Sequence, residues 1–227
     1  MVGTVIVGGG KSERFNDDKI FYNINSYPLI FYTLIPFIKC NKVEKIVLVL
    51  SKEKSHEGVE LFKNFNKIVA IVEGGKERKE SVLNGLKYFY ENEKIDYVLI
   101  HDGARPNIKI ELIEKVIQNL DENSCVIPVI SVTETIKYIE NKNTIKTLDR
   151  DKLFITQTPQ GFPFLKLYNL LNRYLYEKFF DESTLFEKEG LPIKIIDGDI
   201  ENIKVTYKSD ILKVLDFIKK NESRYRF

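Results

Sequence analysis

The clearest chemical signal in this sequence is a set of residues that could bind phosphate near the N-terminus. Gly8-Gly9-Gly10 follows an apolar run, and the cations Lys11, Arg14 and Lys19 come soon after it. Glycines allow a tight turn and a close approach of the backbone to a ligand. Backbone N–H groups in such a turn favour an anion, as do lysine and arginine side chains. We therefore predict a nucleotide phosphate site. The alternative is an ordinary strand-to-helix turn with solvated charges.

Two widespread phosphate motifs do not match the spacing of this turn. The Walker A motif needs a glycine at the position of Val5, which lies inside the apolar run. The dinucleotide fingerprint needs its third glycine at the position of Glu13, whose carboxylate would face the pyrophosphate. The turn therefore belongs to neither motif, and its sequence argues against a dehydrogenase.

Two further segments with similar chemistry each follow an expected strand. Gly75 and Ser81 lie in one of them, and Asp102 and Arg105 lie in the other. In open α/β sheets, ligands bind at the carboxyl ends of the strands. We therefore expect all three segments to converge on one crevice, although they are far apart in the sequence.

The elements that must position these residues follow an alternating rhythm. Strands are expected at 4–7, 45–50, 67–72, 96–100 and 125–130, and helices at 28–39, 55–63, 77–90 and 110–120. This alternation predicts an α/β fold with a doubly wound, mostly parallel sheet. Further helices are expected at 164–178, 181–189 and 209–220, with late strands at 193–196 and 203–206. We expect a loose tail at 222–227.

The rhythm is interrupted by a segment that reads as a β-hairpin arm. Two short strands, 135–138 and 144–148, flank the turn-rich tetrapeptide 140–143. A two-stranded ribbon is marginally stable alone, so that the arm, at about 131–150, should pack on something. A second subunit is the obvious candidate.

The composition is that of an ordinary globular protein, and we expect a single domain that spans residues 1–227. The chain is 43% apolar and 30% charged, with a net charge of +2, which gives no general reason to expect nucleic acid or membrane binding. Two cysteines and two histidines do not support a structural zinc site. No run approaches the roughly 20 apolar residues of a membrane span. Few cysteines and no signal-peptide pattern predict a cytoplasmic protein.

Taken together, the motifs resemble one family over nearly the whole chain. They are 8–14 (GGGKSER), 74–82 (GGKERKESV), 101–106 (HDGARP), 133–137 (TETIK), 149–150 (DR), 157–160 (QTPQ) and 201–206 (ENIKVT). This set resembles the 2-C-methyl-D-erythritol 4-phosphate cytidylyltransferases of the non-mevalonate isoprenoid pathway. The resemblance implies a Rossmann-like nucleotidyltransferase that transfers CMP from CTP to 2-C-methyl-D-erythritol 4-phosphate. The products would be 4-diphosphocytidyl-2-C-methyl-D-erythritol and pyrophosphate.

The resemblance also implies roles for individual residues. Arg14, Lys19 and Lys204 would hold the triphosphate and stabilise charge on the reacting phosphorus. The nucleotide would be bound by Gly8, Gly9, Gly10, Gly75, Ser81 and Asp102, and the acceptor by Arg105, Thr135, Arg150 and Thr158. The arm would cross to a second copy in a homodimer. Mg²⁺ would be held mainly by the CTP phosphates, and no protein ligand for it can be named from the sequence.

Three positions depart from the family pattern. Lys19 follows Arg14 by five residues in place of seven, so that Lys11 is an alternative to it. Lys76 replaces an aspartate that is frequent beside the base, and Phe180 replaces a threonine beside the acceptor. These departures leave open a non-catalytic nucleotide-binding module.

A second enzymatic reading is ribitol-5-phosphate cytidylyltransferase, which shares most of this frame. That family tends to carry valine before the arginine of the HDGARP motif, where this chain has Ala104. Retention of Arg14, Arg150 and Lys204 argues against the non-catalytic nucleotide-binding module and for either enzyme.

Overall fold

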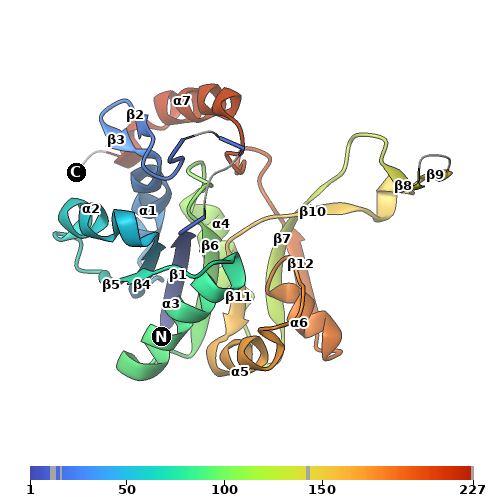
Figure 1. Ribbon diagram of the computed structural model, residues 1–227, viewed down its shortest axis with the longest axis horizontal. Coiled ribbons are helices and arrows are strands. Elements are labelled where there is room, and N and C mark those ends of the chain that lie inside the picture. The colour runs from blue at the N-terminus through green and yellow to red at the C-terminus, as the bar shows by residue number, and fades with distance from the viewer. Residues whose placement is uncertain (11–13, 16, 142–143, 226–227) are drawn as a thin grey trace.

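The computed structural model describes residues 1–10, 14–15, 17–141 and 144–225, and they build a sandwich of helices around one main sheet (Figure 1). The strand order is β10-β7-β11-β6-β1-β4-β5, and β12 pairs with the outer side of β7. The strands are β1 (Val2–Gly8), β4 (Lys45–Leu50), β5 (Ile68–Glu73), β6 (Tyr97–Asp102), β7 (Cys125–Ser131), β10 (Phe154–Thr156), β11 (Gln160–Pro163) and β12 (Ile193–Asp197). Pairing is parallel except at β10 and β11, which confirms the mostly parallel sheet.

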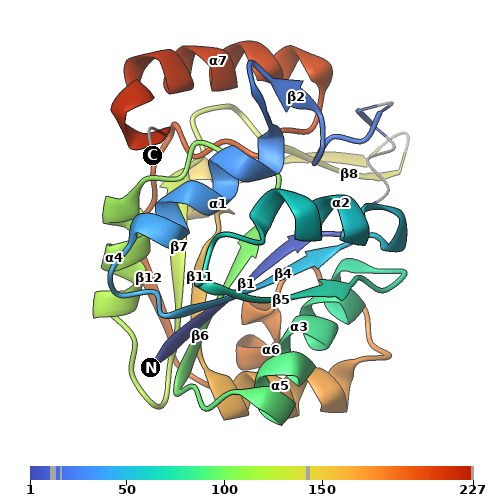
Figure 2. The same cartoon turned by 90° about the vertical axis from the view of Figure 1, so that its left-hand side faces the viewer.

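The apolar strands have side chains on both faces of the sheet, and helices cover both (Figure 2). Along β1, Val5 and Ile6 point to opposite faces and join two separate hydrophobic clusters. The first cluster packs under α1 (Leu29–Lys39), α2 (Lys52–Phe62), α4 (Ile110–Gln118) and α7 (Ile211–Lys220). The second packs under α3 (Arg78–Asn92), α5 (Phe164–Tyr174) and α6 (Ser183–Lys188).

Strand register brings the expected binding segments to a single edge of the sheet. Val7 pairs with Asp102 across β1 and β6, and Gly8 pairs with Leu50 across β1 and β4. Leu50 in turn pairs with Glu73, the last residue of β5. The glycine turn, the segment after β5 and the segment after β6 therefore leave the sheet side by side, which confirms the expected convergence.

Two strands of the sheet were not expected from the sequence, and one expected strand is absent. β10 and β11 are short, antiparallel strands on either side of the cis Thr158–Pro159 bond. Segment 203–206 forms no strand, so that prediction was wrong. Its Val205 N–H donates to the Ala104 carbonyl oxygen at 2.8 Å, which anchors the segment beside β6.

The prediction of a loose tail is also wrong for residues 222–225, which the structure describes. Residues Glu222–Tyr225 form a short 3₁₀ helix, η3, and the Tyr225 ring packs edge-on against Tyr32 with centroids 5.0 Å apart. The last two residues lie outside the described residues. Short elements complete the fold: β2 (Asn23–Ile24), β3 (Tyr27–Pro28), η1 (Arg150–Lys152) and η2 (Lys208–Asp210).

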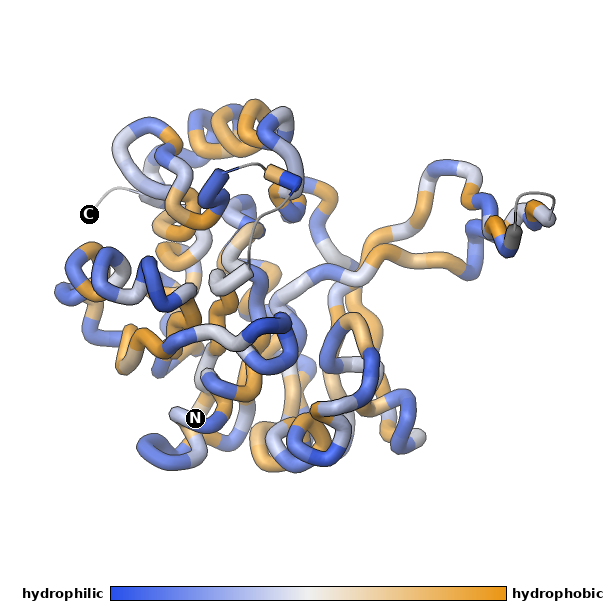
Figure 3. Tube along the Cα trace, in the orientation of Figure 1, coloured by the Kyte–Doolittle hydropathy of each residue, from blue (hydrophilic) through white to orange (hydrophobic). Residues whose placement is uncertain are grey.

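The expected arm is present as β8 (Lys137–Asn141) paired with β9 (Thr144–Thr147), and it projects away from the sandwich (Figure 1). Its predicted turn lies partly outside the described residues. The arm mixes polar and apolar residues (Figure 3), and Ile139 and Ile145 are 65% and 60% exposed. Among the described residues, no helix is long and apolar enough to cross a membrane.

Candidate active site

A pocket opens at the sheet edge where the three segments meet. Its lining comes from the ends of β1 and β6, the turn before α3 and the first turn of α3, the loop before β2 and the segment after β12: Val7, Gly8, Gly9, Gly10, Lys19, Ile20, Gly75, Lys76, Glu77, Arg78, Ser81, Asp102, Ala104 and Lys204. The structure thus brings together all six residues expected to bind the nucleotide. Lys11, the alternative to Lys19, lies outside the described residues.

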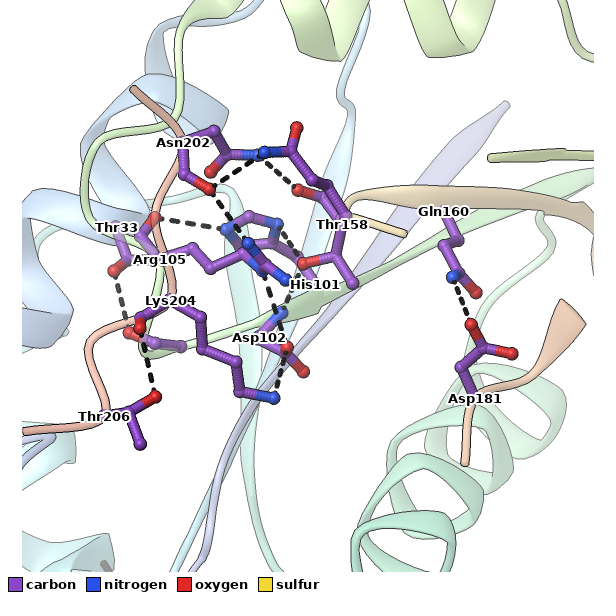
Figure 4. Close-up of polar contacts among 12 residues, drawn as sticks. Thr33, His101, Asp102, Arg105, Thr158, Gln160, Asp181, Asn202, Lys204 and Thr206 are labelled. Carbon is purple, nitrogen blue, oxygen red and sulfur yellow. Dashed lines mark hydrogen bonds and ion pairs between the residues drawn. The ribbon is translucent and has the colours of Figure 1, made fainter. Parts of the chain in front are cut away.

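Asp102, the last residue of β6, is the charged centre of the pocket (Figure 4). Its Oδ1 accepts a hydrogen bond from Arg78 Nε at 3.0 Å, and its Oδ2 lies 2.8 Å from Lys204 Nζ. Arg105 Nε lies 3.6 Å from the same Oδ2. Burial disfavours the charged form of this carboxyl, but the three cations outweigh burial and hold its pKa well below the usual range. Asp102 is therefore ionised at neutral pH.

Lys204 is held over this centre by a network around its loop. Asn202 is fully buried, and its Nδ2 donates to the Thr158 carbonyl oxygen at 2.9 Å. The Asn202 carbonyl oxygen accepts from Arg105 Nη1 at 2.8 Å. Arg105 is itself buried, and through this hydrogen bond it supports the loop that carries Lys204. Its predicted contact with the acceptor is not part of this arrangement and stays a prediction.

Thr158 occupies a place that the sequence did not indicate. Its hydroxyl accepts from the Asp102 backbone N–H at 3.1 Å and lies 3.0 Å from His101 Nδ1. His101 Nε2 lies 3.4 Å from the Arg105 carbonyl oxygen, which can only accept, so Nε2 carries the proton and Thr158 donates to Nδ1. Thr158 is buried and positions Asp102, so the role in acceptor binding that we predicted for it has no support from this contact.

His101 is a structural residue in this network. Burial lowers the pKa of His101 to about 3, so the ring is neutral at physiological pH. A neutral ring suits its two hydrogen bonds, one accepted and one donated.

The turn before α3 is shaped by Ser81 and Glu80. Ser81 Oγ accepts from the Gly75 N–H at 3.1 Å and donates to the Glu77 carbonyl oxygen at 3.2 Å. Glu80 Oε2 accepts from the Lys76 N–H at 2.6 Å and from the Glu77 N–H at 3.3 Å. A Cβ on Gly75 would lie 2.3 Å from the Glu80 Cβ, so only glycine fits there. Ser81 therefore shapes this wall of the pocket through the backbone.

Two of the three cations expected to hold the triphosphate, Lys19 and Lys204, line the pocket. Burial lowers the pKa of Lys19, and the nearby charges of Lys204 and Arg14 lower it further. Positive groups that repel one another in this way form a site that an anion would stabilise. Arg14 is exposed and not part of the pocket lining.

Arg78 and Glu182 were missed as functional candidates. Arg78 Nη1 donates to both carboxylate oxygens of Glu182, at 2.7 and 2.8 Å, while its Nε faces Asp102. The only sequence signal was that Arg78 lies inside the 74–82 motif and that Glu182 follows Phe180, one of the positions that depart from the family pattern. Phe180 itself is 86% exposed.

Thr135 and Arg150, expected to bind the acceptor, lie at the base of the arm and not in the pocket lining. Both are exposed, and Arg150 Nη1 donates to the Thr133 carbonyl oxygen at 2.9 Å. One chain does not bring these two residues together with Lys204.

A divalent cation would find few protein ligands here. No cluster of three or more potential ligands from histidine, cysteine, aspartate and glutamate occurs in the part of the chain that the structure describes. Asp102 and Glu77 are the carboxylates of the pocket lining. One or two carboxylates with substrate phosphates are a usual setting for Mg²⁺. The donor set therefore fits a cation that arrives with a nucleotide.

Comparisons with known proteins agree with one another. A family model described as 2-C-methyl-D-erythritol 4-phosphate cytidylyltransferase matches residues 2–220. The chain is 39% identical over 225 residues to the 2-C-methyl-D-erythritol 4-phosphate cytidylyltransferase of Dictyoglomus thermophilum, with 96% of each chain covered. It is 36% identical to the protein of the same name from Thermosipho africanus, with 93% of this chain and 95% of that protein covered.

Solved structures show the same likeness in three dimensions. The crystal structure of 4-diphosphocytidyl-2C-methyl-D-erythritol synthase from Anaerococcus prevotii matches with a TM-score of 0.83 and 26% identity. That match covers 96% of this chain and 98% of the other.

Proposed function

The chain belongs to the 2-C-methyl-D-erythritol 4-phosphate cytidylyltransferase family, and we infer from this that it transfers CMP from CTP to 2-C-methyl-D-erythritol 4-phosphate. An oxygen of the acceptor phosphate forms a bond to the α-phosphorus of CTP, and the bond from that phosphorus to the bridging oxygen breaks. Pyrophosphate leaves, and 4-diphosphocytidyl-2-C-methyl-D-erythritol is the product. The observation that carries this function is the meeting of Lys19 and Lys204 beside Asp102 at the glycine-rich sheet edge. Positioning and charge stabilisation supply the catalysis in such transfers.

The base is read by backbone groups of the turn before α3. The N–H groups of Gly75, Lys76 and Glu77 all donate to Ser81 or Glu80, so we propose that carbonyl oxygens of this turn contact the base. A carbonyl oxygen pairs with the exocyclic amino group of cytosine and repels the corresponding oxygen of uracil. We expect kcat/KM for UTP to be at least about 100-fold below that for CTP, since a site built for one hydrogen bond rejects its mismatch. Equal turnover of the two nucleotides would contradict this pocket.

Arg14, Lys19 and Lys204 bind the triphosphate and stabilise the charge that develops on the α-phosphorus. Removing one such contact costs roughly 3–4 kcal/mol of transition-state stabilisation, which is about 10²–10³-fold in turnover. Arg14→Ala and Lys204→Ala should therefore lower kcat strongly while the melting temperature stays close to that of the wild type. Near-normal kcat in either purified variant would show that its role is misassigned. If Lys11→Ala is more damaging than Lys19→Ala, Lys11 is the catalytic lysine.

Mg²⁺ is proposed as the cofactor. The CTP phosphates would mainly hold it, in the pocket lined by Gly8, Asp102 and Lys204, because both oxygens of Asp102 are already paired with cations. When bound, the ion neutralises charge on the triphosphate.

The acceptor site is completed by the arm of a second copy. Thr135 and Arg150 lie outside the pocket of their own chain, and Ile139 and Ile145 are exposed on the arm. A twofold dimer that exchanges arms would bury those residues and bring Arg150 to the neighbour's acceptor phosphate.

Mixed dimers test this arrangement. Arg14→Ala and Arg150→Ala homodimers should both be nearly inactive. In a mixed dimer one site carries both lesions and the other carries none, so random mixing should restore about a quarter of the wild-type sites. If activity does not recover after confirmed subunit exchange, Arg150 acts in the site of its own chain or has no role in catalysis.

We also propose that residues 1–227 form a single domain, because one continuous sheet runs from β1 to β12. A cytoplasmic location is proposed because Cys40 and Cys125 are both free thiols.

A further inference from the structure

Glu182 is a buried carboxylate for which the transfer reaction has no direct use. It immediately precedes α6, and its side chain is fully buried. Both of its oxygens accept hydrogen bonds from Arg78 Nη1, at 2.7 and 2.8 Å. A buried carboxylate needs a cation beside it, because the charged form is costly to desolvate. Glu182 therefore fixes the position of the Arg78 guanidinium.

Arg78 uses a different edge of the same guanidinium to reach the active site. Its Nε donates to Asp102 Oδ1 at 3.0 Å, while Lys204 Nζ lies 2.8 Å from Oδ2. Each oxygen of Asp102 thus has its own cationic partner. The planar guanidinium holds the carboxylate plane in one orientation, which a flexible lysine could not do from the same position.

We propose that Glu182, acting through Arg78, is a positioning residue that orients Asp102 and so places the Lys204 ammonium for CMP transfer. This inference rests on the proposed function. Glu182 and Asp102 lie on segments 80 residues apart, and Arg78 comes from a third, so the pair ties the base-binding turn to the α6 side of the pocket.

Arg78 has little capacity to act on phosphate directly. Its Nε and Nη1 are both engaged by carboxylates, and those two anions offset its single positive charge. Arg14, Lys19 and Lys204 have no comparable buried pair of carboxylates among the described ion pairs. The phosphate-binding cations and the positioning cation are thus distinct.

A double substitution separates positioning from simple stabilisation. Arg78→Met or Glu182→Met alone leaves the other buried charge without its partner, so each should lower the melting temperature by about 10 °C. The Arg78→Met/Glu182→Met variant removes both charges, keeps the net charge of the pocket and fills the space with apolar atoms. Its melting temperature should recover to within a few degrees of the wild type.

Turnover should not recover with stability. Because Asp102 loses its Nε donor in the double variant, kcat should be about 10–100-fold below wild type, which is the usual effect of losing a group that orients a reactive residue. The KM for CTP should change by less than about threefold, since net charge and the glycine turns are unchanged. The matched control is Arg173→Met/Glu189→Met, which removes an exposed ion pair of the same 2.7 Å length and should leave kcat unchanged.

Recovery of both stability and kcat in the double variant would overturn the proposal, because the pair would then be purely structural. If the double variant fails to fold, Arg78→Lys decides the question. A lysine keeps a charge near Glu182 but cannot present the two edges of a guanidinium, so kcat should fall, and wild-type kcat would refute positioning. Failure of the proposed function is distinguishable, because the wild type itself would then release no pyrophosphate.

Discussion

Replacing Thr158 by valine tests whether this residue positions Asp102 or binds the acceptor. Valine has nearly the same shape but no hydroxyl, so the Asp102 N–H and His101 Nδ1 both lose their partner in a buried site. Each unsatisfied group costs about 1–3 kcal/mol, so the free energy of unfolding should fall by about 2–6 kcal/mol. For a chain of this size the melting temperature should drop by roughly 5–20 °C.

Thr158→Ser is the matched control, because it keeps the hydroxyl and removes only a methyl group. Thermal unfolding of the three proteins, with steady-state kinetics on the same samples, gives the comparison. We expect the serine variant to stay within a few degrees of the wild type and to keep most of its kcat. A valine variant with unchanged melting temperature and a raised KM for the acceptor alone would refute the positioning role and restore the contact expected from the sequence.

Three further predictions concern the pocket and its protonation. Ser81→Ala should raise the KM for CTP several-fold with little change in kcat, because the Gly75 N–H loses its acceptor and the base-binding turn loosens; steady-state kinetics at varied CTP measures this. The lowered pKa of Lys19 should rise when the CTP phosphates bind, so CTP binding at alkaline pH should take up protons. Calorimetry in two buffers of different ionisation enthalpy detects that uptake, and Lys19→Met should abolish it. Because burial lowers the pKa of His101 to about 3, the unfolded chain binds a proton that the folded chain does not between about pH 6.5 and pH 3. Stability should therefore fall as pH falls through that window, and denaturant unfolding of His101→Gln should show a shallower decline.

The parallel core of the fold was predictable because its signals are local. Runs such as β4 are uninterrupted apolar stretches flanked by turn residues, and both ends of such a run are visible in the sequence. The convergence of Gly8, Gly75 and Asp102 followed from the rule that parallel strands place their carboxyl ends at one edge.

The antiparallel strands were missed because their signals are weak. β10 and β11 have only 3 and 4 residues, and a proline separates them. The segment at 203–206 resembles a strand in composition, yet it pairs with no strand, and its Val205 N–H donates instead to the Ala104 carbonyl oxygen just after β6. Whether these segments form strands depends on the neighbours that they meet in the folded chain, and no local sequence pattern reveals those neighbours.

Within the site, the types of residue were predictable but not what each one touches. Thr158 was grouped with acceptor-binding residues, although its hydroxyl serves Asp102 and His101. Arg78 and Glu182 were overlooked because a charged residue in a sequence is more often solvated than paired in the interior. Their pairing joins α3 to the start of α6, which no periodicity of either helix predicts.

The most direct test of the central claim is pyrophosphate release by the purified protein with CTP and Mg²⁺, measured side by side with two acceptors. We predict rapid, saturable release with 2-C-methyl-D-erythritol 4-phosphate, and a kcat/KM at least about 100-fold lower with ribitol 5-phosphate. The same release should fall to background in the Lys204→Ala variant. Equal or greater turnover with ribitol 5-phosphate, or no release with either acceptor from correctly folded protein, would contradict the account.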